Sequence, residues 1–319
     1  MTRIRASSPD DLLGLVPYLL GFHPSESVAA VLVGGGRVVM TARMDASELE
    51  QPDELADYLR DLLAEHRATA LVLITYSGDP ADRPRSETLV SRLGDLVTDA
   101  LLVDGQRWWS LFCDGCCPPE GLPYDPQSHP LSAAAVYAGL TALPDREALR
   151  AQVAGPPAEQ RPALERLHDR AAEDLVGLGA ATRKRLVRKR VREALAGDRR
   201  LTDAECAELA VLVLHLGVRD VAWAQLTRAD ADRHVALWSQ VVARAPDCWA
   251  SAPLCLLGVS AWVSGNGALQ NCCVERVGQI DPGYTMAGLL ADINRRALPP
   301  AYWDEWRESF RRDPKLMAG

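Results

Sequence analysis

Residues 70–76 read Ala-Leu-Val-Leu-Ile-Thr-Tyr, a run of apolar and β-branched side chains without polar alternation. A run of this length and composition is typical of a β-strand. A strand that is apolar throughout is buried on both of its faces, and such strands occur mainly in sheets that helices cover on both sides. The run therefore predicts an α/β domain.

The segments around this strand predict the rest of that domain. A helix begins at Ser8-Pro9, where a hydroxyl caps the first turn and proline lacks only an unused N–H, and it ends at Gly21. Three glycines at 34–36 join two strand patterns; a strand follows them and no nucleotide-binding motif does, so they predict a hairpin rather than a phosphate loop. The predicted strands are 27–33, 37–43, 70–76, 100–103 and 106–112, and the predicted helices between them are 52–66 and 86–97.

This order is β-β-α-β-α-β-β on a mixed sheet, in two or three layers. Strand signals end after residue 130, and helical patterns at 131–140 and 145–153 lead to Gly155-Pro156-Pro157, the best linker candidate. The sequence predicts an α/β domain at 1–145, a linker at 146–160 and an all-α, tetratricopeptide-like domain at 161–319.

Residues 251–284 resemble one tetratricopeptide repeat, a helix–turn–helix unit of 34 residues. The resemblance departs from the repeat at Gln270, where a small residue is expected. Tetratricopeptide arrays usually bind protein segments, so the resemblance implies a protein partner for the helical domain. Trp238, Trp249 and Trp262 are expected to fill neighbouring, degenerate helix pairs. The matching residues are Leu254, Leu257, Gly258, Ala261, Gly265, Asn266, Val274, Val277, Asp281, Pro282 and Tyr284.

Composition limits the partners and the compartment. The chain has 319 residues and a formal net charge of −8, which argues against capture of the whole protein by nucleic acid or an anionic membrane. The N-terminal apolar run contains Pro17 and follows Asp10 and Asp11, so it does not resemble a signal peptide, and no apolar run is long enough for a membrane span. We expect a cytoplasmic protein whose eight cysteines are thiols or metal ligands.

The densest group of reactive side chains lies in residues 107–130. Cys113 and Cys116 form a Cys-x-x-Cys turn that supplies two zinc ligands from one loop, and His129 follows Cys117 twelve residues later. The alternatives are a redox dithiol, or a buried thiol cluster held by Pro118-Pro119 with Trp108-Trp109 filling the domain interface. The candidate metal or thiol site comprises Cys113, Cys116, Cys117, Glu120 and His129, and Cys272-Cys273 is a further source of ligands.

Residues 182–192 hold seven basic side chains in eleven positions, with Leu186, Val187 and Val191 at helical spacing. Such a helix buries one face and presents a basic one, which favours binding to phosphates. The alternative is a solvated helix paired with acids such as Glu173, Asp174, Glu205 and Glu208. The candidate basic surface comprises Arg183, Lys184, Arg185, Arg188, Lys189, Arg190 and Arg192.

A third candidate is the loop that contains His23, Ser25 and Glu26, where a Ser–His–acid triad is conceivable. The sequence has no Gly-x-Ser-x-Gly elbow, no His-Glu-x-x-His motif and no Walker motif, so hydrolysis by a triad is disfavoured. His23 is expected to cap a helix or to bond a neighbouring strand. His215, within Val-Leu-Val-Leu-His-Leu-Gly, is expected to be a core histidine.

Four segments resemble an actinobacterial family that is catalogued only as a domain of unknown function: 15–24 (LVPYLLGFHP), 100–109 (ALLVDGQRWW), 116–121 (CCPPEG) and 133–139 (AAAVYAG). The resemblance covers nearly the whole chain. It implies a cytosolic location and the two-part layout, and it implies no activity.

The leading hypothesis is a non-enzymatic protein-interaction or regulatory module that binds a partner through its helical domain. The alternative is a metal-assisted enzyme or nucleic-acid-associated factor that uses the loop at 113–129, with zinc, and the basic helix at 183–192. A third hypothesis is ligand binding at the strand ends of the α/β domain. The sequence is compatible with a homo-oligomer and does not specify the oligomeric state.

Overall fold

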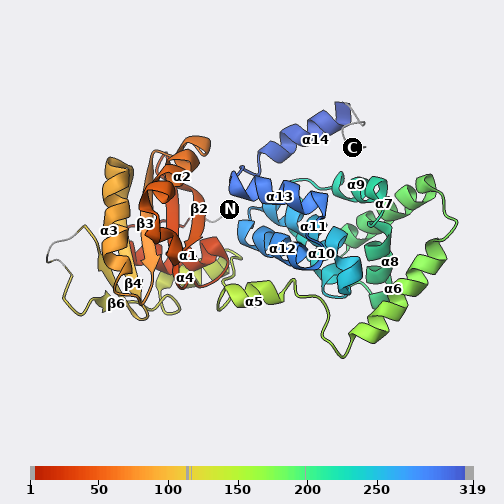
Figure 1. The fold of residues 1–319 in the computed structure, drawn as a ribbon, viewed down its shortest axis with the longest axis horizontal. Helices are drawn as coiled ribbons and strands as arrows, with labels where there is room; N and C mark the ends of the chain where they lie inside the picture. The colour runs from red at the N-terminus through yellow and green to blue at the C-terminus, as the bar shows by residue number, and fades with distance from the viewer. Residues whose placement is uncertain (1–3, 113–114, 116, 198, 313–319) are drawn as a thin grey trace. The chain divides into compact units, whose positions relative to one another are not determined.

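The computed structural model describes residues 4–112, 115, 117–197 and 199–312 of the chain. The chain divides into two compact units, Met1–Arg146 and Glu147–Gly319. The first unit contains a mixed sheet with helices and the second is helical (Figure 1), which confirms the prediction of an α/β domain followed by a helical domain.

The N-terminal unit is built around a six-stranded sheet in the order β2-β1-β3-β4-β5-β6. Only β3 and β4 are parallel, and helix α3 connects them. The elements are α1 (Pro9–Leu20), β1 (Ser27–Gly34), β2 (Arg37–Asp45), η1 (Ala46–Glu50), α2 (Pro52–Glu65), β3 (Ala70–Tyr76), α3 (Asp82–Leu93), η2 (Gly94–Leu96), β4 (Val97–Asp104), β5 (Arg107–Ser110), β6 (Leu122–Pro123) and α4 (Pro130–Tyr137).

Helices cover β3 on both faces, as its unbroken apolar run requires. On one face Thr75 Oγ1 lies 2.7 Å from Ser86 Oγ of α3. Figure 1 shows α1 and α4 on the other side of the strands, where Ser132 Oγ of α4 donates a hydrogen bond to the Gly14 carbonyl of α1. All of 71–76 is buried, so β3 forms the centre of this core.

Local sequence signals explain where most of these elements begin and end. Ser8 Oγ accepts the Asp11 N–H at 3.1 Å and caps α1, and Gly21 ends that helix with a φ of +83°. The β1–β2 hairpin turns at Gly35 and Gly36, both with positive φ. Helix α3 starts at Asp82 rather than at residue 86, because Pro84 fits the first turn, where its missing N–H has no helical partner. It stops at Leu93 because Gly94 has a φ of +57°.

The second unit contains ten helices among its described residues. The elements are α5 (Arg146–Ala151), α6 (Arg161–Leu175), α7 (Ala180–Ala196), α8 (Asp203–Leu212), α9 (Leu216–Trp223), α10 (Ala231–Val242), α11 (Asp247–Ser264), α12 (Gly267–Ile280), α13 (Thr285–Arg295) and α14 (Tyr302–Arg312).

Helix α11 is the central element of this unit. Every side chain from Ala250 to Val263 is buried, and a helix that is apolar on all sides must be surrounded by others. Helix α12 follows it through a turn at Gly265-Asn266, and Gly258 lies where an added Cβ would approach Leu290 Cδ1 to 3.1 Å and Cys273 Cβ to 3.3 Å. The small residue thus permits close packing of α11 against α12 and α13.

Segment 146–160 begins with helix α5, which contributes to the helical unit. Leu149 and Val153 are buried, and Arg150 Nε lies 3.2 Å from Glu275 Oε2 of α12.

The prediction that His215 is a core residue is wrong. The run 211–217 is not one helix, because α8 ends at Leu212 and His215 precedes α9 at an exposed turn. Among the described residues, no helix combines the length and apolarity that a bilayer crossing needs.

Candidate binding site: a tryptophan-lined pocket

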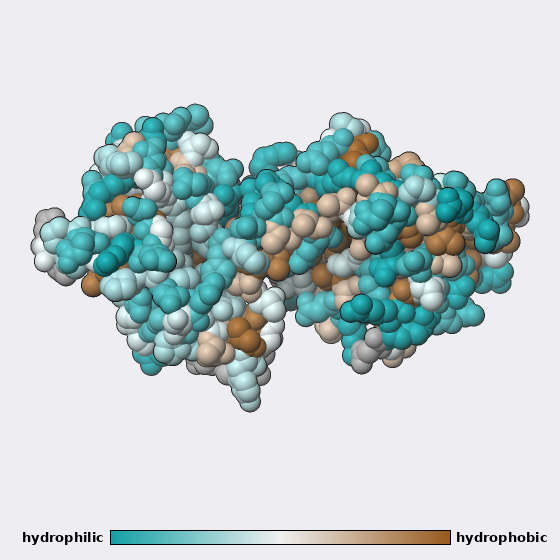
Figure 2. Space-filling view, turned by 90° about the horizontal axis from the view of Figure 1, so that it is seen from below, coloured by the Kyte–Doolittle hydropathy of each residue, from teal (hydrophilic) through white to brown (hydrophobic). Residues whose placement is uncertain are grey.

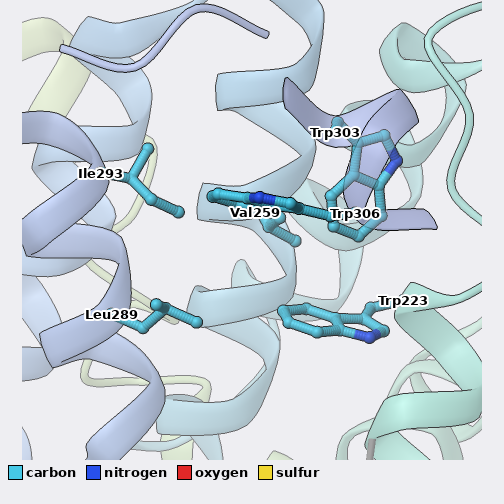
Figure 3. A pocket seen from close by; sticks show the side chains of 6 residues that line it. All are labelled: Trp223, Val259, Leu289, Ile293, Trp303 and Trp306. Atoms are coloured by element: carbon cyan, nitrogen blue, oxygen red, sulfur yellow. The ribbon is translucent and has the colours of Figure 1, made fainter. Parts of the chain in front are cut away.

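An apolar pocket opens in the helical unit between four helices (Figure 3). Its volume is about 230 Å³. The lining residues are Trp223 of α9, Val259 of α11, Leu289 and Ile293 of α13, and Trp303 and Trp306 of α14.

Helical periodicity brings these side chains to one place. Leu289 and Ile293 are four residues apart on α13, and Trp303 and Trp306 are three apart on α14, so each pair lies on one helix face. The two pairs face each other only because α13 and α14 are close in the fold. Val259 comes from the buried central helix and forms the floor of the pocket.

Trp303 fixes the geometry of the aromatic wall. Its side chain is 1% exposed, and its Nε1–H donates a 3.1 Å hydrogen bond to the Leu226 carbonyl. Its ring meets the edge of Trp223 at 5.6 Å and that of Trp262 at 6.3 Å between centroids, the tilted arrangement that aromatic pairs prefer. The Trp303 ring is packed against other rings, and its one polar atom is hydrogen-bonded. Trp303 therefore anchors α14 to the bundle.

Trp306 forms the wall that lies opposite Trp223 (Figure 3). Its ring lies 5.4 Å from that of Trp262, whose Nε1–H donates to the Leu298 carbonyl at 2.7 Å. Figure 3 shows Trp306 and Trp223 on opposite sides of an open space, with Leu289 and Ile293 closing a third side. Leu289 is 45% exposed, so the pocket is reached from solvent.

The lining of the pocket offers apolar and aromatic contacts. All six side chains are apolar or aromatic, so none supplies a general acid, a general base or a metal ligand. The volume is below the roughly 300–1,000 Å³ of small-molecule sites and suits a single bulky apolar group.

Other apolar side chains are exposed on the same unit. Leu214 and Leu216, just before and at the start of α9, are 40% and 52% exposed. Figure 2 shows brown, apolar patches among hydrophilic side chains on the visible face of the helical unit. Isolated exposed leucines are ordinary, and the pocket differs from them because it is concave.

The cysteine loop lies partly outside the described residues, which do not include Cys113 and Cys116. Cys117 Sγ accepts the Ser110 N–H at 3.4 Å, and Glu120 is exposed. Trp109 Nε1–H donates to the Pro119 carbonyl at 3.2 Å and holds the loop against β5. Within the described part of the chain, no group of three His, Cys, Asp or Glu side chains is arranged to hold a metal ion.

His129 has structural contacts at the start of α4. Its Nδ1 accepts the Leu131 N–H at 3.2 Å, and its Nε2 lies 3.2 Å from Asp10 Oδ2 and 3.6 Å from Asp11 Oδ1. Its ring covers Gly14, where a Cβ would be 2.6 Å from Nδ1. His129 thus joins the first turns of α1 and α4. The other proposed ligands, Cys272 and Cys273, are buried in the helical unit, where burial raises the pKa of the Cys273 thiol.

The residues of the His23 loop make separate contacts. The His23 N–H donates to the Leu143 carbonyl at 2.9 Å, and burial lowers the pKa of its imidazole. Ser25 is exposed. The Glu26 carboxylate faces Ser77 Oγ at 3.4 Å, and that hydroxyl donates a 2.7 Å hydrogen bond to Asp82. No hydrogen bond links His23 to Ser25 or Glu26 in the described residues.

The basic residues of α7 divide between two faces. Arg183 donates to the Leu178 and Leu175 carbonyls at 3.0 and 2.7 Å, and Arg190 Nε pairs with Glu208 at 2.7 Å. Lys184 approaches Gly217 of α9. The four exposed side chains are Arg185, Arg188, Lys189 and Arg192.

Sequence reasoning did not find the tryptophan pocket, because its lining residues are spread from Trp223 to Trp306. The one available signal was composition: eight of the aromatic residues are tryptophans. Trp238 and Trp262 are buried in the helical core, and the Trp249 ring lies 5.8 Å from that of His168.

Of three comparisons with known proteins, one identifies a family for this chain. Neither the curated proteins nor the solved structures contain a match to this chain. A family model described as Domain of unknown function (DUF4192) matches residues 9–301, which span both units, and the chain belongs to that family.

Proposed function

We propose that this protein is a non-enzymatic interaction module, and that its helical unit binds a partner protein by taking one bulky apolar side chain into the tryptophan-lined pocket. The observation that carries the proposal is a concave apolar site open to solvent, walled by Trp223 and Trp306 on opposite sides.

The geometry favours a protein segment over a free small molecule. Protein interfaces place most of their binding energy in a few large side chains that enter desolvated pockets, and tryptophan is enriched there. The pocket holds one such anchor. Charged groups stand nearby: Arg228 Nη1 lies 3.2 Å from Asp304 Oδ2 of α14, which suits the polar rim around an interface core.

Two further features support the proposal. The α11–α12 hairpin lies in the segment that resembles a tetratricopeptide repeat, a module that usually binds protein segments. Cys206, Cys248, Cys255 and Cys273 are free thiols, in keeping with a reducing cytosol as the site of action.

The pocket is tested with Leu289→Asp. Leu289 is partly exposed, so a carboxylate at this position is solvated and the protein still folds. An apolar group that enters the pocket would have to desolvate that carboxylate, which costs binding free energy. Peptides selected from a random library on the native protein should share a bulky apolar residue. They should bind the variant at least about tenfold more weakly, which corresponds to about 1.4 kcal/mol.

The matched control is Leu216→Asp, which introduces the same charge at a leucine that is 52% exposed and does not line the pocket. It should bind the selected peptides like the native protein. Peptides without a common apolar residue, or equal binding to native protein and Leu289→Asp, would refute the proposed function.

A further inference from the structure

Helix α7 presents a separate, strongly charged surface. Its exposed arc carries Arg185, Arg188, Lys189 and Arg192, here called the basic stripe. The spacing of three, four and seven residues places these four side chains along one side of the helix. Val187 and Val191 are completely buried on the opposite side.

Only one of the four side chains of the basic stripe has an acidic partner in the described residues. Lys189 Nζ lies 3.7 Å from Glu193 Oε1. In the described part of the chain, Arg185, Arg188 and Arg192 have no acidic partner within ion-pair distance; Arg185 only donates a long hydrogen bond to Thr182 Oγ1, at 3.4 Å. Of the acids that the sequence suggested as partners, Glu208 pairs with Arg190 and Glu205 with Arg199. In the described residues no ion pair joins Glu173 or Asp174 to the basic stripe.

Charge is distributed unevenly along the chain. Residues 1–146 contain 11 Lys and Arg against 21 Asp and Glu, a net charge of −10, whereas residues 147–319 contain 24 against 22, a net charge of +2. The net charge of −8 therefore belongs to the N-terminal unit. The objection to polyanion binding that the whole-chain charge raises does not apply to the unit that carries the basic stripe.

We propose that the basic stripe binds the phosphate backbone of double-stranded nucleic acid without sequence preference. From Arg185 to Arg192 the helix rises about 10 Å. Over that length each strand of a duplex presents about three phosphates, at about 3.4 Å of axial spacing, which matches the number of unpaired guanidinium groups.

The composition of the exposed arc selects this ligand over two others. A protein interface needs an apolar or aromatic core, and the exposed uncharged residues of α7 are three alanines, Ala180, Ala181 and Ala196. Single-stranded nucleic acid is usually held by bases stacked on aromatic rings, and α7 has none. A duplex backbone requires only cations at the right spacing.

The test is binding of the full-length protein to a fluorescent 30-base-pair duplex, as DNA and as RNA, from 50 to 500 mM salt. Three to four phosphate contacts predict a slope of log K against log salt of about −3. Arg188→Gln should reduce the magnitude of that slope by about one. Arg185→Glu with Arg188→Glu and Arg192→Glu should abolish binding at 50 mM salt.

The control is Arg37→Glu with Arg60→Glu and Arg92→Glu, three exposed arginines of the N-terminal unit. It changes the net charge by the same amount and should leave duplex binding intact. Circular dichroism and the melting temperature verify the fold of each variant; if the triple charge reversal does not fold, Arg185→Gln with Arg192→Gln replaces it and should weaken binding at least tenfold.

Four results would overturn the proposal. They are a salt slope near zero, native affinity in the folded α7 variants, equal or tighter binding of a single-stranded oligonucleotide, and equal competition by polyglutamate at matched charge. The last two would mean that the stripe does not recognise the duplex backbone.

Discussion

Among single residues, two buried histidines are the clearest source of pH sensitivity. His168 is fully buried; its Nδ1 lies 2.8 Å from the Leu164 carbonyl and its ring contacts Trp249. His234 is 1% exposed, with Asp230 Oδ1 3.9 Å from its Nε2. Burial lowers the pKa of both imidazoles below 6.5, and the neighbouring acids offset this only in part. Burial therefore favours the neutral form of both side chains in the folded protein.

We expect acid to destabilise the helical unit. Because the folded-state pKa values are lowered, the unfolded chain binds more protons as the pH falls below 6.5, so the stabilisation present above pH 6.5 is lost on acidification. The melting temperature should fall between pH 7.5 and pH 5.5, and His168→Gln with His234→Gln should flatten that profile. His215→Gln, at an exposed turn, should not; an equal flattening in that variant would contradict the assignment.

At the scale of elements, α14 depends on its two tryptophans. Trp303 is the fully buried anchor, and Trp306 packs on Trp262 at the pocket. The ion pair between Asp304 and Arg228 is exposed on both sides and contributes at most about 1 kcal/mol. Attachment of α14, and with it one wall of the pocket, therefore rests on apolar contacts.

Trp303→Ala should cost about 3–5 kcal/mol in the free energy of unfolding, since it removes a buried indole and leaves a cavity. Amide hydrogen exchange should then accelerate in 302–312 more than in α11. Trp303→Phe should cost less, because it keeps the ring and loses the hydrogen bond to the Leu226 carbonyl. Unchanged exchange of α14 in Trp303→Ala would show that other contacts hold this helix.

Sequence patterns predicted elements where local physics dominates. The strand 70–76 was predicted with its observed ends because the run has only seven residues and contains β-branched side chains, which favours a buried strand over a buried helix. The shift in α3 and the omission of β6, a strand of two residues, arose where proline placement or shortness weakens the local signal. His215 was misplaced because the helical pattern continues through a turn that packing, rather than periodicity, imposes.

At the scale of the whole molecule, charge is segregated along the chain. The excess of acidic residues lies in 1–146, and the basic stripe lies in the other unit. The sequence isoelectric point is about 5.3, which lies below pH 6.5, where the lowered pKa values of the buried histidines begin to reduce stability. Loss of net repulsion and loss of stability therefore coincide on acidification.

We expect a solubility minimum near pH 5.3, where the net charge approaches zero and repulsion between molecules vanishes. Static light scattering from pH 4 to 8 measures it, and refolding of the recovered precipitate at pH 7.5 separates charge-driven association from unfolding. A minimum above pH 7 would contradict the charge distribution derived from the sequence.

By itself the sequence determined the fold class, the central strand and the basic face of α7, because each depends on neighbours within one strand or a few helical turns. Only the tertiary structure decided the rest. The pocket exists because Trp223, Leu289 and Trp306 meet across helices, and the basic stripe became defined once Arg183 and Arg190 were taken up by α6 and α8. Contacts between distant segments depend on how the helices pack. The periodicity of one helix shows which of its faces is apolar, but it does not show which face of another helix packs against it.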